Sequence, residues 1–559
     1  MSELTENLSK NQGAELCAQF GERFKSLHGV MCFLLDFLPM NESAGLELSS
    51  FRRAGLFKDY FGIDTWLLTD CYQPDSVGNA IEQIKLGRLS AVRLVNLYDY
   101  LQGINRSQLK KQPVALTVST SWQATPAEGT KDLIIRDGSG NIIMYCHRHP
   151  QDETIDYVNH IKDGKIYRRD TYDRLGFLSR TEFTEKDTGF THTALYFRPD
   201  HSLALTETYR HNPEPEGKPI VDAINVMDRQ GHTVQRFSYH DELVAYWLLQ
   251  LLNDKQSFYI AIADQIMDYQ RYFVELRRQQ AAYPNVRVIG VSHNCHTVDP
   301  LDVMHSQPGD NYRFLFDRNQ RVDRVICLTK KQKADVEERW GAQAHPIDVI
   351  PHHFVPLPVP ADSAARTTGA LPPHSLIMIG RFAPAKDHAA ALEVFSKVKT
   401  QVPDASLHFF GSGGLMQEIK QKALDLGLEQ SVIFHGFLPD LNPVYATASA
   451  LMMTSRHEGF SLALQEALYA GLPVVSFDCR YGPAALIEDG VNGYLVENGD
   501  KEGMAARLVE ILGDDKLRER LSQAARLSMR RFTPQRIAAL WAQTLLSLLP
   551  EQDSGTAQA

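Results

Sequence analysis

Disulfide frameworks, membrane spans and metal motifs are all missing from this sequence. Its 559 residues include seven cysteines, an odd number, and none of them forms a C-x-x-C pair. This pattern argues against a disulfide scaffold or a zinc ribbon and fits a reducing compartment. The best candidate for a signal peptide, Val30–Leu38, starts late and contains Asp36, and no run of about 20 apolar residues occurs. We therefore expect a cytoplasmic chain without a transmembrane segment.

An excess of charge of one sign is missing as well. The chain has 58 basic and 68 acidic residues, for a net charge of -10, which gives no support to a general nucleic-acid binder. With 43% hydrophobic and 23% charged residues, the composition excludes disorder for most of the chain. At roughly 150 residues per domain, the length predicts three or four domains.

The first half of the chain has the pattern of an α/β unit with a β-rich insertion. The apolar run Val30–Leu38 predicts a buried strand, and the small-residue turn Asn41–Gly45 leads into a helix. From about Lys131 to Ser238, short β-branched or aromatic segments alternate with turn signals, which predicts an antiparallel meander. The α/β pattern then resumes with the strand Phe258–Ile262, so the meander is expected to be an insertion.

The second half repeats the alternation of strands and helices after a proline-rich segment that predicts a linker. Such alternation predicts parallel sheets with right-handed crossovers, here two lobes with a cleft between them. The expected units are an N-terminal arm (1–25), a first Rossmann-like lobe (26–70 and 239–355), a β-rich insertion (71–238), a linker (356–373), a second lobe whose last helix returns to the first (374–550) and a tail (551–559).

Two cations follow the first strand of the second lobe. The strand Leu376–Ile379 ends at Gly380, and Arg381 and Lys386 follow with the spacing R-x4-K. Ligands of open α/β sheets bind beyond the carboxyl ends of the strands, so these charges are placed to hold a diphosphate. A solvated loop is the alternative.

A glycine turn containing Gly411 and Gly413 follows the next strand and opens a helix. Its backbone N–H groups could face an anion or a ribose, although glycine turns after strands are common. Met416 stands where the pattern G-x-G-x-x-G needs its last glycine, which disfavours a dinucleotide oxidoreductase.

Two glutamates stand in the most informative segment, Arg456–Leu468. Glu458 and Glu466 have seven residues between them, so we expect them two helical turns apart on nearly one face, with Gly459 at the mouth of the helix. A carboxylate on an apolar helix face costs free energy unless it has partners, and sugar hydroxyls are such partners. A solvated helix with chance spacing is the alternative.

The same lobe continues with Tyr469–Val475, Tyr481–Pro483 and Asp489–Tyr494. Together with the R-x4-K cations and the E-x7-E glutamates, these segments closely resemble the retaining glycosyltransferases of family 4, which have the GT-B fold of two Rossmann-like lobes. The resemblance is specific from about Arg324 to Val496. It implies an α/β chain with the GT-B fold and an antiparallel β insertion in the N-terminal lobe, and a C-terminal lobe that binds a nucleotide sugar.

The resemblance also implies a role for each residue. Arg381 and Lys386 would neutralise the diphosphate of a UDP-sugar, Glu466 would hold the ribose hydroxyls, and Glu458 would touch the donor sugar near its reacting centre. The two cations would replace a metal, and no D-x-D motif occurs, so no cofactor is expected. The further donor-binding residues expected on this basis are Gly45, Gly411, Gly413, Gly459, Phe460 and His296.

Two histidines at the end of a strand are candidates for the family's histidine that contacts the donor sugar. His293 and His296 both follow Val291, and His293 is favoured as the catalytic one because it is nearer the strand end. A packed or exposed histidine is the alternative. Gly45 matches the family's glycine after the first strand, but the usual double glycine is missing here.

The β insertion, Gly45-Leu46-Glu47 and Tyr481–Pro483 resemble a Gram-positive subgroup. It includes poly(glycerol-phosphate) and poly(ribitol-phosphate) α-glycosyltransferases of wall teichoic acid, and enzymes that place N-acetylglucosamine on Ser/Thr of serine-rich adhesins. In relatives the insertion supports self-association or partner binding. Here the segment His160–Arg169 holds four cations in eight residues, which suits a polyanionic acceptor; an exposed hairpin with solvated charges is the alternative.

The interpretation favoured by the sequence is a retaining α-glycosyltransferase that moves glucose or N-acetylglucosamine from a UDP-sugar to a teichoic acid. The alternatives are an O-glycosyltransferase acting on Ser/Thr of a surface protein, a transferase with a small sugar or lipid acceptor, and a non-catalytic partner subunit. Both cations, Arg381 and Lys386, and both glutamates, Glu458 and Glu466, are present. Their presence disfavours a non-catalytic partner subunit. We expect a homo-oligomer or a partner subunit through the insertion, no nucleic-acid partner, and a place in the cytoplasm or at the inner face of the membrane.

Overall fold

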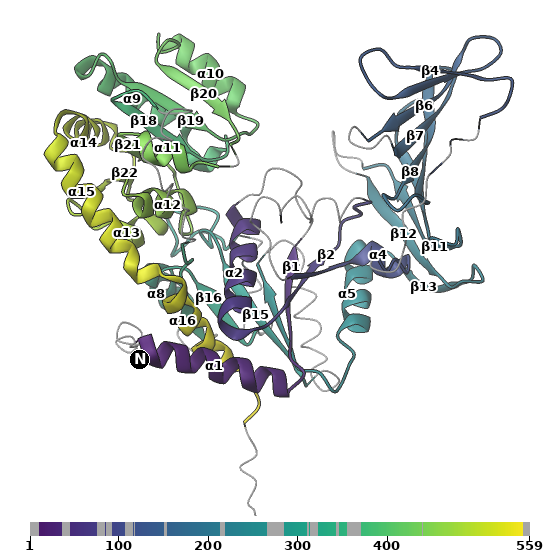
Figure 1. Ribbon diagram of the computed structural model, residues 1–559, viewed down its shortest axis with the longest axis horizontal. Coiled ribbons are helices and arrows are strands. Elements are labelled where there is room, and N and C mark those ends of the chain that lie inside the picture. Colours follow the sequence, from purple (N-terminus) through teal and green to yellow (C-terminus); the bar gives the residue numbers. More distant parts are fainter. Residues whose placement is uncertain are drawn as a thin grey trace, which may run out of the picture.

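The described part of the chain contains three sheets (Figure 1). The computed structural model describes residues 10–35, 45–74, 84, 92–106, 114, 116, 118–149, 154–212, 219–264, 284–309, 312, 322–341, 346–354, 371–438 and 440–551. Several expected features lie outside these residues: part of the arm (1–9), most of the turn before Gly45 (41–44), most of the linker (356–370) and nearly all of the tail (552–559).

The N-terminal lobe is built on a seven-stranded parallel sheet in the order β17-β16-β15-β14-β1-β2-β3. Strands β14 and β1 are the most apolar, and all five residues of β14 are buried, as expected for a parallel sheet covered on both faces. The strands are β1 (Val30–Leu35), β2 (Thr65–Thr69), β3 (Val92–Asn96), β14 (Tyr259–Ala263), β15 (Val286–Ser292), β16 (Arg324–Cys327) and β17 (Ile347–Val349). The helices of this lobe are α1 (Lys10–Ser26), α2 (Gly45–Phe61), α4 (Leu97–Leu101), α5 (His240–Leu251) and α8 (Lys330–Trp340).

The insertion is a ten-stranded antiparallel meander in which each strand pairs with the next along the chain. It projects from the N-terminal lobe beyond α4 and α5 (Figure 1). Its strands are β4 (Gln123–Pro126), β5 (Leu133–Arg136), β6 (Ile142–Arg148), β7 (Ile155–Lys162), β8 (Lys165–Tyr172), β9 (Leu178–Thr184), β10 (Thr191–Phe197), β11 (Leu203–Arg210), β12 (Ile220–Met227) and β13 (Thr233–Phe237).

The insertion begins later than residue 71, where the sequence placed its start. Strand β3 pairs in parallel with β2, with Leu67 opposite Leu94, and the side chain of Asn96 caps α4 by accepting the N–H of Tyr98. Both elements therefore belong to the N-terminal lobe. The antiparallel sheet starts at Gln123.

The C-terminal lobe has a six-stranded parallel sheet in the order β20-β19-β18-β21-β22-β23. Its strands are β18 (Ser375–Ile379), β19 (Ser406–Phe410), β20 (Val432–Gly436), β21 (Ala450–Met453), β22 (Val474–Phe477) and β23 (Tyr494–Val496). The helical elements are η3 (Pro384–Lys386), α9 (His388–Gln401), α10 (Met416–Asp425), α11 (Asn442–Thr447), α12 (Leu462–Ala470), α13 (Gly482–Leu486), α14 (Lys501–Gly513), α15 (Asp515–Ser528), η4 (Met529–Phe532) and α16 (Pro534–Leu546).

The last helix crosses back to the N-terminal lobe, where α16 packs against α1 and α2 (Figure 1). Phe20 and Phe24 of α1 are fully buried, and the Trp541 ring of α16 meets Phe57 of α2 edge to face at 5.5 Å. The polar segment expected to form an N-terminal arm is thus, from Lys10, a packed helix. Between its small and polar residues, α1 carries a buried apolar stripe that includes Cys17, Phe20 and Phe24.

No helix in the described part of the chain combines the length and the apolar composition that crossing a bilayer requires. All seven cysteines lie in described segments and none forms a disulfide.

Candidate functional site

The loop after β18 carries the two predicted cations. Lys386 ends the short helix η3, and its Nζ donates to Glu458 Oε1 at 2.5 Å. Arg381 is exposed, and its guanidinium has no hydrogen bond or ion pair with any described residue. Asp387 follows and caps α9 by accepting the N–H of Ala390 at 3.1 Å. The structure thus joins Lys386 to one predicted glutamate and leaves the Arg381 charge available for an anion.

The glycine turn after β19 packs directly on this cation loop. Gly411 and Gly413 have φ angles of 134° and 147°, where glycine is the suitable residue because other side chains are strained. A Cβ on Gly411 would overlap the carbonyl oxygen of Gly380, and one on Gly413 would overlap the backbone of Phe382. The N–H of Gly411 donates to Gly436 O at 2.8 Å, so it does not face an anion as the sequence suggested. These glycines let two loops of the site touch.

Glu458 lies in the loop after β21 and is almost fully buried. Its Oε1 accepts hydrogen bonds from Lys386 and from Ser455 Oγ, the latter at 2.7 Å. The expectation that both glutamates share one helix face is wrong. Helix α12 begins only at Leu462, with the Ser461 side chain accepting the N–H of Leu464 as its N-cap. Glu458 therefore stands in the loop and only Glu466 is helical.

Glu466 is held between the two lobes. Arg52 Nη2, on α2 of the N-terminal lobe, lies 2.6 Å from Glu466 Oε1, and the Tyr445 hydroxyl donates to Oε2 at 2.9 Å. The sequence indicated that this carboxylate needs partners, and two of them are protein groups. Neither Arg52 nor Tyr445 could be identified from the sequence, because they lie 414 and 21 positions away along the chain.

His293 follows β15 and faces a buried carboxylate that sequence reasoning missed. Its Nε2 lies 2.7 Å from Asp264 Oδ1, and Asp264 also accepts from Arg53 Nη2 at 2.6 Å and from Ser50 Oγ at 2.9 Å. Burial alone would raise the pKa of Asp264, but the charges and hydrogen bonds of Arg53 and His293 outweigh it and hold that pKa well below its usual range. The available signal was position, since Asp264 directly follows β14 at the carboxyl edge of a parallel sheet.

Gly459 brings the two lobes together at His293. A Cβ at Gly459 would overlap the carbonyl oxygen of His293, and the neighbouring His457 Nδ1 lies 3.0 Å from Asn294 Oδ1. Phe460 is buried, and its ring meets His352 edge to face at 5.7 Å. The residues Glu458, Gly459, Phe460 and His293 therefore meet where the lobes touch.

His296 is packed one layer away from this meeting point. Its ring stacks on Tyr481 at 5.8 Å and meets Trp340 edge to face at 5.4 Å. Burial lowers its pKa to about 4, so the imidazole is neutral. His296 is fully buried, and the His293 side chain is 8% exposed.

The Tyr481–Pro483 segment, which the sequence connected with the type of acceptor, builds the interior instead. Tyr481, Gly482 and Pro483 are buried, and the peptide of Tyr481 donates to Glu458 O. Arg480 beside it forms an ion pair with Asp335 of the N-terminal lobe at 3.2 Å. This segment supports the Glu458 loop and joins the lobes.

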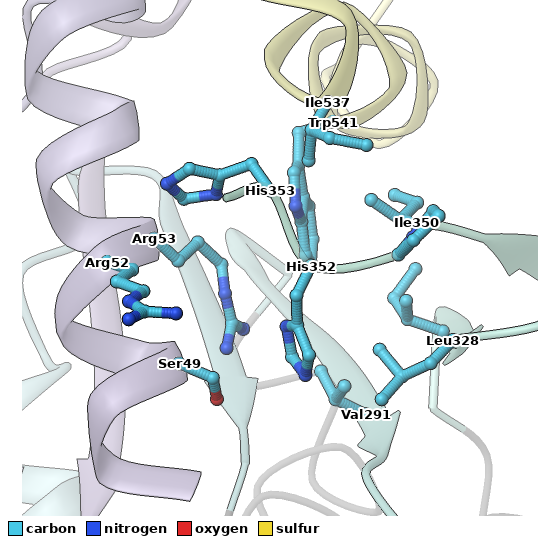
Figure 2. A pocket seen from close by; sticks show the side chains of 12 residues that line it. Ser49, Arg52, Arg53, Val291, Leu328, Ile350, His352, His353, Ile537 and Trp541 are labelled. Atoms are coloured by element: carbon cyan, nitrogen blue, oxygen red, sulfur yellow. The ribbon is translucent and has the colours of Figure 1, made fainter. Parts of the chain in front are cut away.

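A small cavity lies between α2 and α16 (Figure 2). Arg52 and Arg53 reach toward it from α2, and His352 and His353 line it from the segment after β17. Its free volume, about 10 Å³, holds about one water molecule. Burial and then the two arginine charges lower the pKa of His353 to about 3, so the cavity has no charge from that ring.

Two predicted features stand apart from this cluster. Gly45 is the first residue of α2, the helix that carries Arg52. In the insertion, Lys165 pairs with Asp187 at 3.0 Å and Arg168 with Asp170 at 2.8 Å, so two of the four cations of the expected patch are compensated.

In the described segments no group of three or more His, Cys, Asp or Glu side chains is arranged to hold a metal ion.

Known proteins share this sequence pattern and architecture. Residues 368–528 match the family described as Glycosyl transferases group 1. Over 516 residues the chain is 24% identical to poly(glycerol-phosphate) alpha-glucosyltransferase of Bacillus subtilis strain 168. The alignment covers 88% of this chain and 71% of that protein.

Two solved structures have a similar fold. A mutant of S. aureus TarM in complex with Fondaparinux, alpha-GlcNAc-glycerol and UDP has a TM-score of 0.76 at 19% identity, over 92% of this chain and 99% of that one. The pneumococcal O-GlcNAc transferase GtfA in complex with UDP and GlcNAc has a TM-score of 0.75 at 17% identity, over 94% of this chain and 100% of that one.

These similarities agree with the resemblance that the R-x4-K and E-x7-E residues indicated. The structural likeness confirms the GT-B fold, and the family match covers both cations and both glutamates. The chain is therefore a glycosyltransferase with a group 1 glycosyl transferase domain on a GT-B fold.

Proposed function

We propose that this glycosyltransferase is a retaining enzyme that moves glucose or N-acetylglucosamine from a UDP-sugar to a polyol-phosphate polymer, a teichoic acid. The observation that carries the donor half is the Lys386–Glu458 ion pair in the same loop cluster as the exposed Arg381. The acceptor half is supported by the name of the Bacillus subtilis relative and by the alpha-GlcNAc-glycerol in the TarM complex.

In this proposal the donor lies across the carboxyl edges of both sheets. Arg381 and Lys386 hold the diphosphate by charge, without a metal, since a fork and a point charge together match its oxygens. Glu466 accepts the ribose hydroxyls. Glu458 keeps the Lys386 ammonium in place from one side and faces the sugar region, and His293 approaches the sugar from the N-terminal lobe.

The reaction needs one bond to form where another breaks on the same face of the sugar. The bond from the anomeric carbon to the diphosphate oxygen breaks, and the acceptor hydroxyl oxygen bonds to that carbon from the same side. The acceptor proton passes to the departing diphosphate. Arg381 and Lys386 stabilise the negative charge that grows on the leaving group, which is where preorganised cations lower a barrier most.

The test is to mix the purified chain with UDP-glucose or UDP-N-acetylglucosamine and, separately, a purified teichoic acid or a serine-rich peptide, and to follow UDP release. We expect release with one UDP-sugar and the teichoic acid. Release only with the peptide would overturn the polymer acceptor and keep the transferase. No UDP release with either UDP-sugar and either acceptor would overturn both proposed acceptors and point to a small acceptor or a required partner subunit.

A second candidate is O-glycosylation of Ser/Thr in a surface protein, which the likeness to pneumococcal GtfA favours. Both candidates place the enzyme in the cytoplasm or at the inner face of the membrane, where UDP-sugars are available, and both leave the insertion to bind a second copy or a partner subunit. A non-catalytic partner role is disfavoured, because Arg381, Lys386, Glu458 and Glu466 are all present.

A further inference from the structure

Glu466 has partners from both lobes, which is unusual for a residue expected to bind only a nucleotide. Tyr445 on α11 belongs to the same lobe as Glu466, whereas Arg52 on α2 belongs to the other. Both side chains of the Arg52–Glu466 pair are largely buried, at 12% and 19% exposure. An ion pair this shielded from solvent has a stronger interaction than one on an open surface.

The hydrogen-bond count leaves acceptor positions on the same carboxylate. Each carboxylate oxygen can accept about two hydrogen bonds. Arg52 takes one position on Oε1 and Tyr445 takes one on Oε2, so one position on each oxygen remains. Two adjacent hydroxyls, such as the 2′ and 3′ hydroxyls of a ribose, match that pair of positions.

Arg52 lies on α2 in a position from which it contacts Glu466. It extends from α2 beside Arg53 toward the small cavity (Figure 2), and its Nη1 is buried without a hydrogen-bond partner among the described residues. Arg52 meets Glu466 Oε1 through one nitrogen, Nη2, and Tyr445 meets Oε2, so the two contacts together limit the rotation of the Glu466 carboxylate. Next to it, Gln465 Nε2 donates to His352 O at 2.7 Å, which anchors the same turn of α12.

We propose that Arg52 is a positioning residue for the donor nucleotide: it reaches across the cleft and orients the Glu466 carboxylate so that it accepts the ribose hydroxyls. Nucleotide binding in the C-terminal lobe then depends on closure of the N-terminal lobe, because Arg52 meets Glu466 only when the lobes touch. This inference rests on the proposed role of Glu466 in holding the ribose.

The test compares UDP with 2′-deoxy-UDP, which lacks one of the two hydroxyls. Binding of each nucleotide is measured by calorimetry for the wild-type chain, Arg52→Gln and, as a control on the exposed end of the same helix, Lys58→Gln. We expect wild type and Lys58→Gln to prefer UDP by about tenfold, as for the loss of one charge-assisted hydrogen bond. Arg52→Gln should weaken UDP binding by about tenfold and reduce the preference over 2′-deoxy-UDP to less than threefold.

A merely structural role for Arg52 would weaken both nucleotides equally and leave their ratio unchanged, which would overturn the proposal. Tighter UDP binding by Arg52→Gln would also overturn it, because Arg52 would then compete with the ribose. If Arg52→Gln does not fold, Arg52→Lys replaces it. Lys keeps the charge and loses the planar guanidinium, so the ratio of the affinities for UDP and 2′-deoxy-UDP should again fall.

The outcomes separate this inference from the proposed function. If the wild-type chain prefers UDP over 2′-deoxy-UDP and Arg52→Gln keeps the same preference, only the role of Arg52 is overturned. Wild-type chain without any ribose preference would overturn the role of Glu466 and this inference with it. Wild-type chain that binds neither nucleotide would overturn the UDP-sugar assignment as well.

Discussion

Lys386 is the residue on which the proposed chemistry depends most, because its ammonium pairs with the buried Glu458 carboxylate and is proposed to hold the leaving diphosphate. We expect Lys386→Ala to lower the transfer rate by about a hundredfold or more, the usual cost of losing one preorganised charge donor. Lys386→Gln should lose as much rate while keeping a hydrogen bond to Glu458. UDP release under saturating donor measures the effect.

The control for this change is Lys397→Ala, a surface lysine of the same lobe that pairs with Glu502, and it should transfer normally. Near-normal turnover by Lys386→Gln with an unchanged melting temperature would contradict the role of Lys386 in the reaction.

His388, two residues beyond Lys386, predicts how stability responds to pH. It is 2% exposed, its ring stacks on Phe382 at 4.1 Å, and neither ring nitrogen has a hydrogen-bond partner among the described residues. Burial, and then the Lys386 charge, lower its pKa to about 4. The unfolded chain takes up a proton near pH 6.5 and the folded chain does not, so stability is full above pH 6.5 and falls as the pH drops toward 4, by about 3 kcal/mol.

His388→Phe should remove this part of the acid sensitivity and keep the stacking. Thermal melts of the variant and the wild type from pH 7.5 to pH 4 measure it, and we expect the melting temperature of the variant to exceed that of the wild type by a margin that grows as the pH falls. A margin independent of pH would mean that His388 titrates normally.

Single residues could be predicted where local chemistry marks them, and not where a partner from a distant segment defines them. Arg381, Lys386 and Glu466 follow from spacing and sheet-edge position. Asp264 and Arg52 do not, because their contacts join residues 211 to 414 positions apart and an isolated Asp or Arg is ordinarily a surface residue.

Among the elements, the loop from Arg456 to Ser461 is one of those through which the lobes meet, and Gly459 lies directly against the backbone of His293 there. Gly459→Ala places a methyl group on the carbonyl oxygen of His293, so the lobes must separate or the loop must shift. We expect a loss of transfer of about a hundredfold, because displacement of catalytic groups by about 1 Å costs that much. Steady-state UDP release measures it.

Gly414→Ala is the matched control, since a Cβ there meets nothing within 4 Å. We expect it to retain activity. Normal transfer by Gly459→Ala would show that the lobes need not approach this closely during the reaction.

This loop also explains why one expectation from the sequence failed. Strands and helices of both lobes were recognisable from apolar runs, but the E-x7-E spacing suggested one helix over both glutamates. Ser461 has a φ of 72°, outside the helical region, so α12 cannot extend back to Glu458. Spacing alone carries no information on where a backbone turns.

At the scale of the whole molecule, the net charge of -10 does not predict where charged side chains are paired and where they are not. Of the four cations that suggested a polyanion patch in the insertion, Lys165 and Arg168 pair with Asp187 and Asp170 at 3.0 and 2.8 Å. The charge left available in the described cleft residues is that of Arg381. In the proposed function the insertion serves a partner or an acceptor, and where it lies depends on the joint between the insertion and the N-terminal lobe.

That joint is a buried carboxylate surrounded by tyrosines. Glu207 of β11 is 3% exposed and accepts hydroxyl hydrogen bonds from Tyr98 of α4 at 3.0 Å, from Tyr196 of β10 at 2.7 Å and from Tyr209. Arg180 stacks over the rings of Tyr72 and Tyr196. Because Tyr98 comes from the lobe and the others from the meander, Glu207 ties the two units together.

Glu207→Gln should loosen the insertion without touching the donor site. The amide offers one acceptor oxygen in place of two and adds donors among hydroxyls that already donate, so buried groups are left unpaired at about 2 kcal/mol. We expect faster proteolysis within the antiparallel meander from Gln123 to Phe237 and a much lower rate with a polymer acceptor, while donor hydrolysis by water stays near normal. Glu185→Gln, which alters an exposed pair with His211, should change neither. Equal loss of both rates in Glu207→Gln would mean that the joint supports the catalytic lobe itself and does not place an acceptor module.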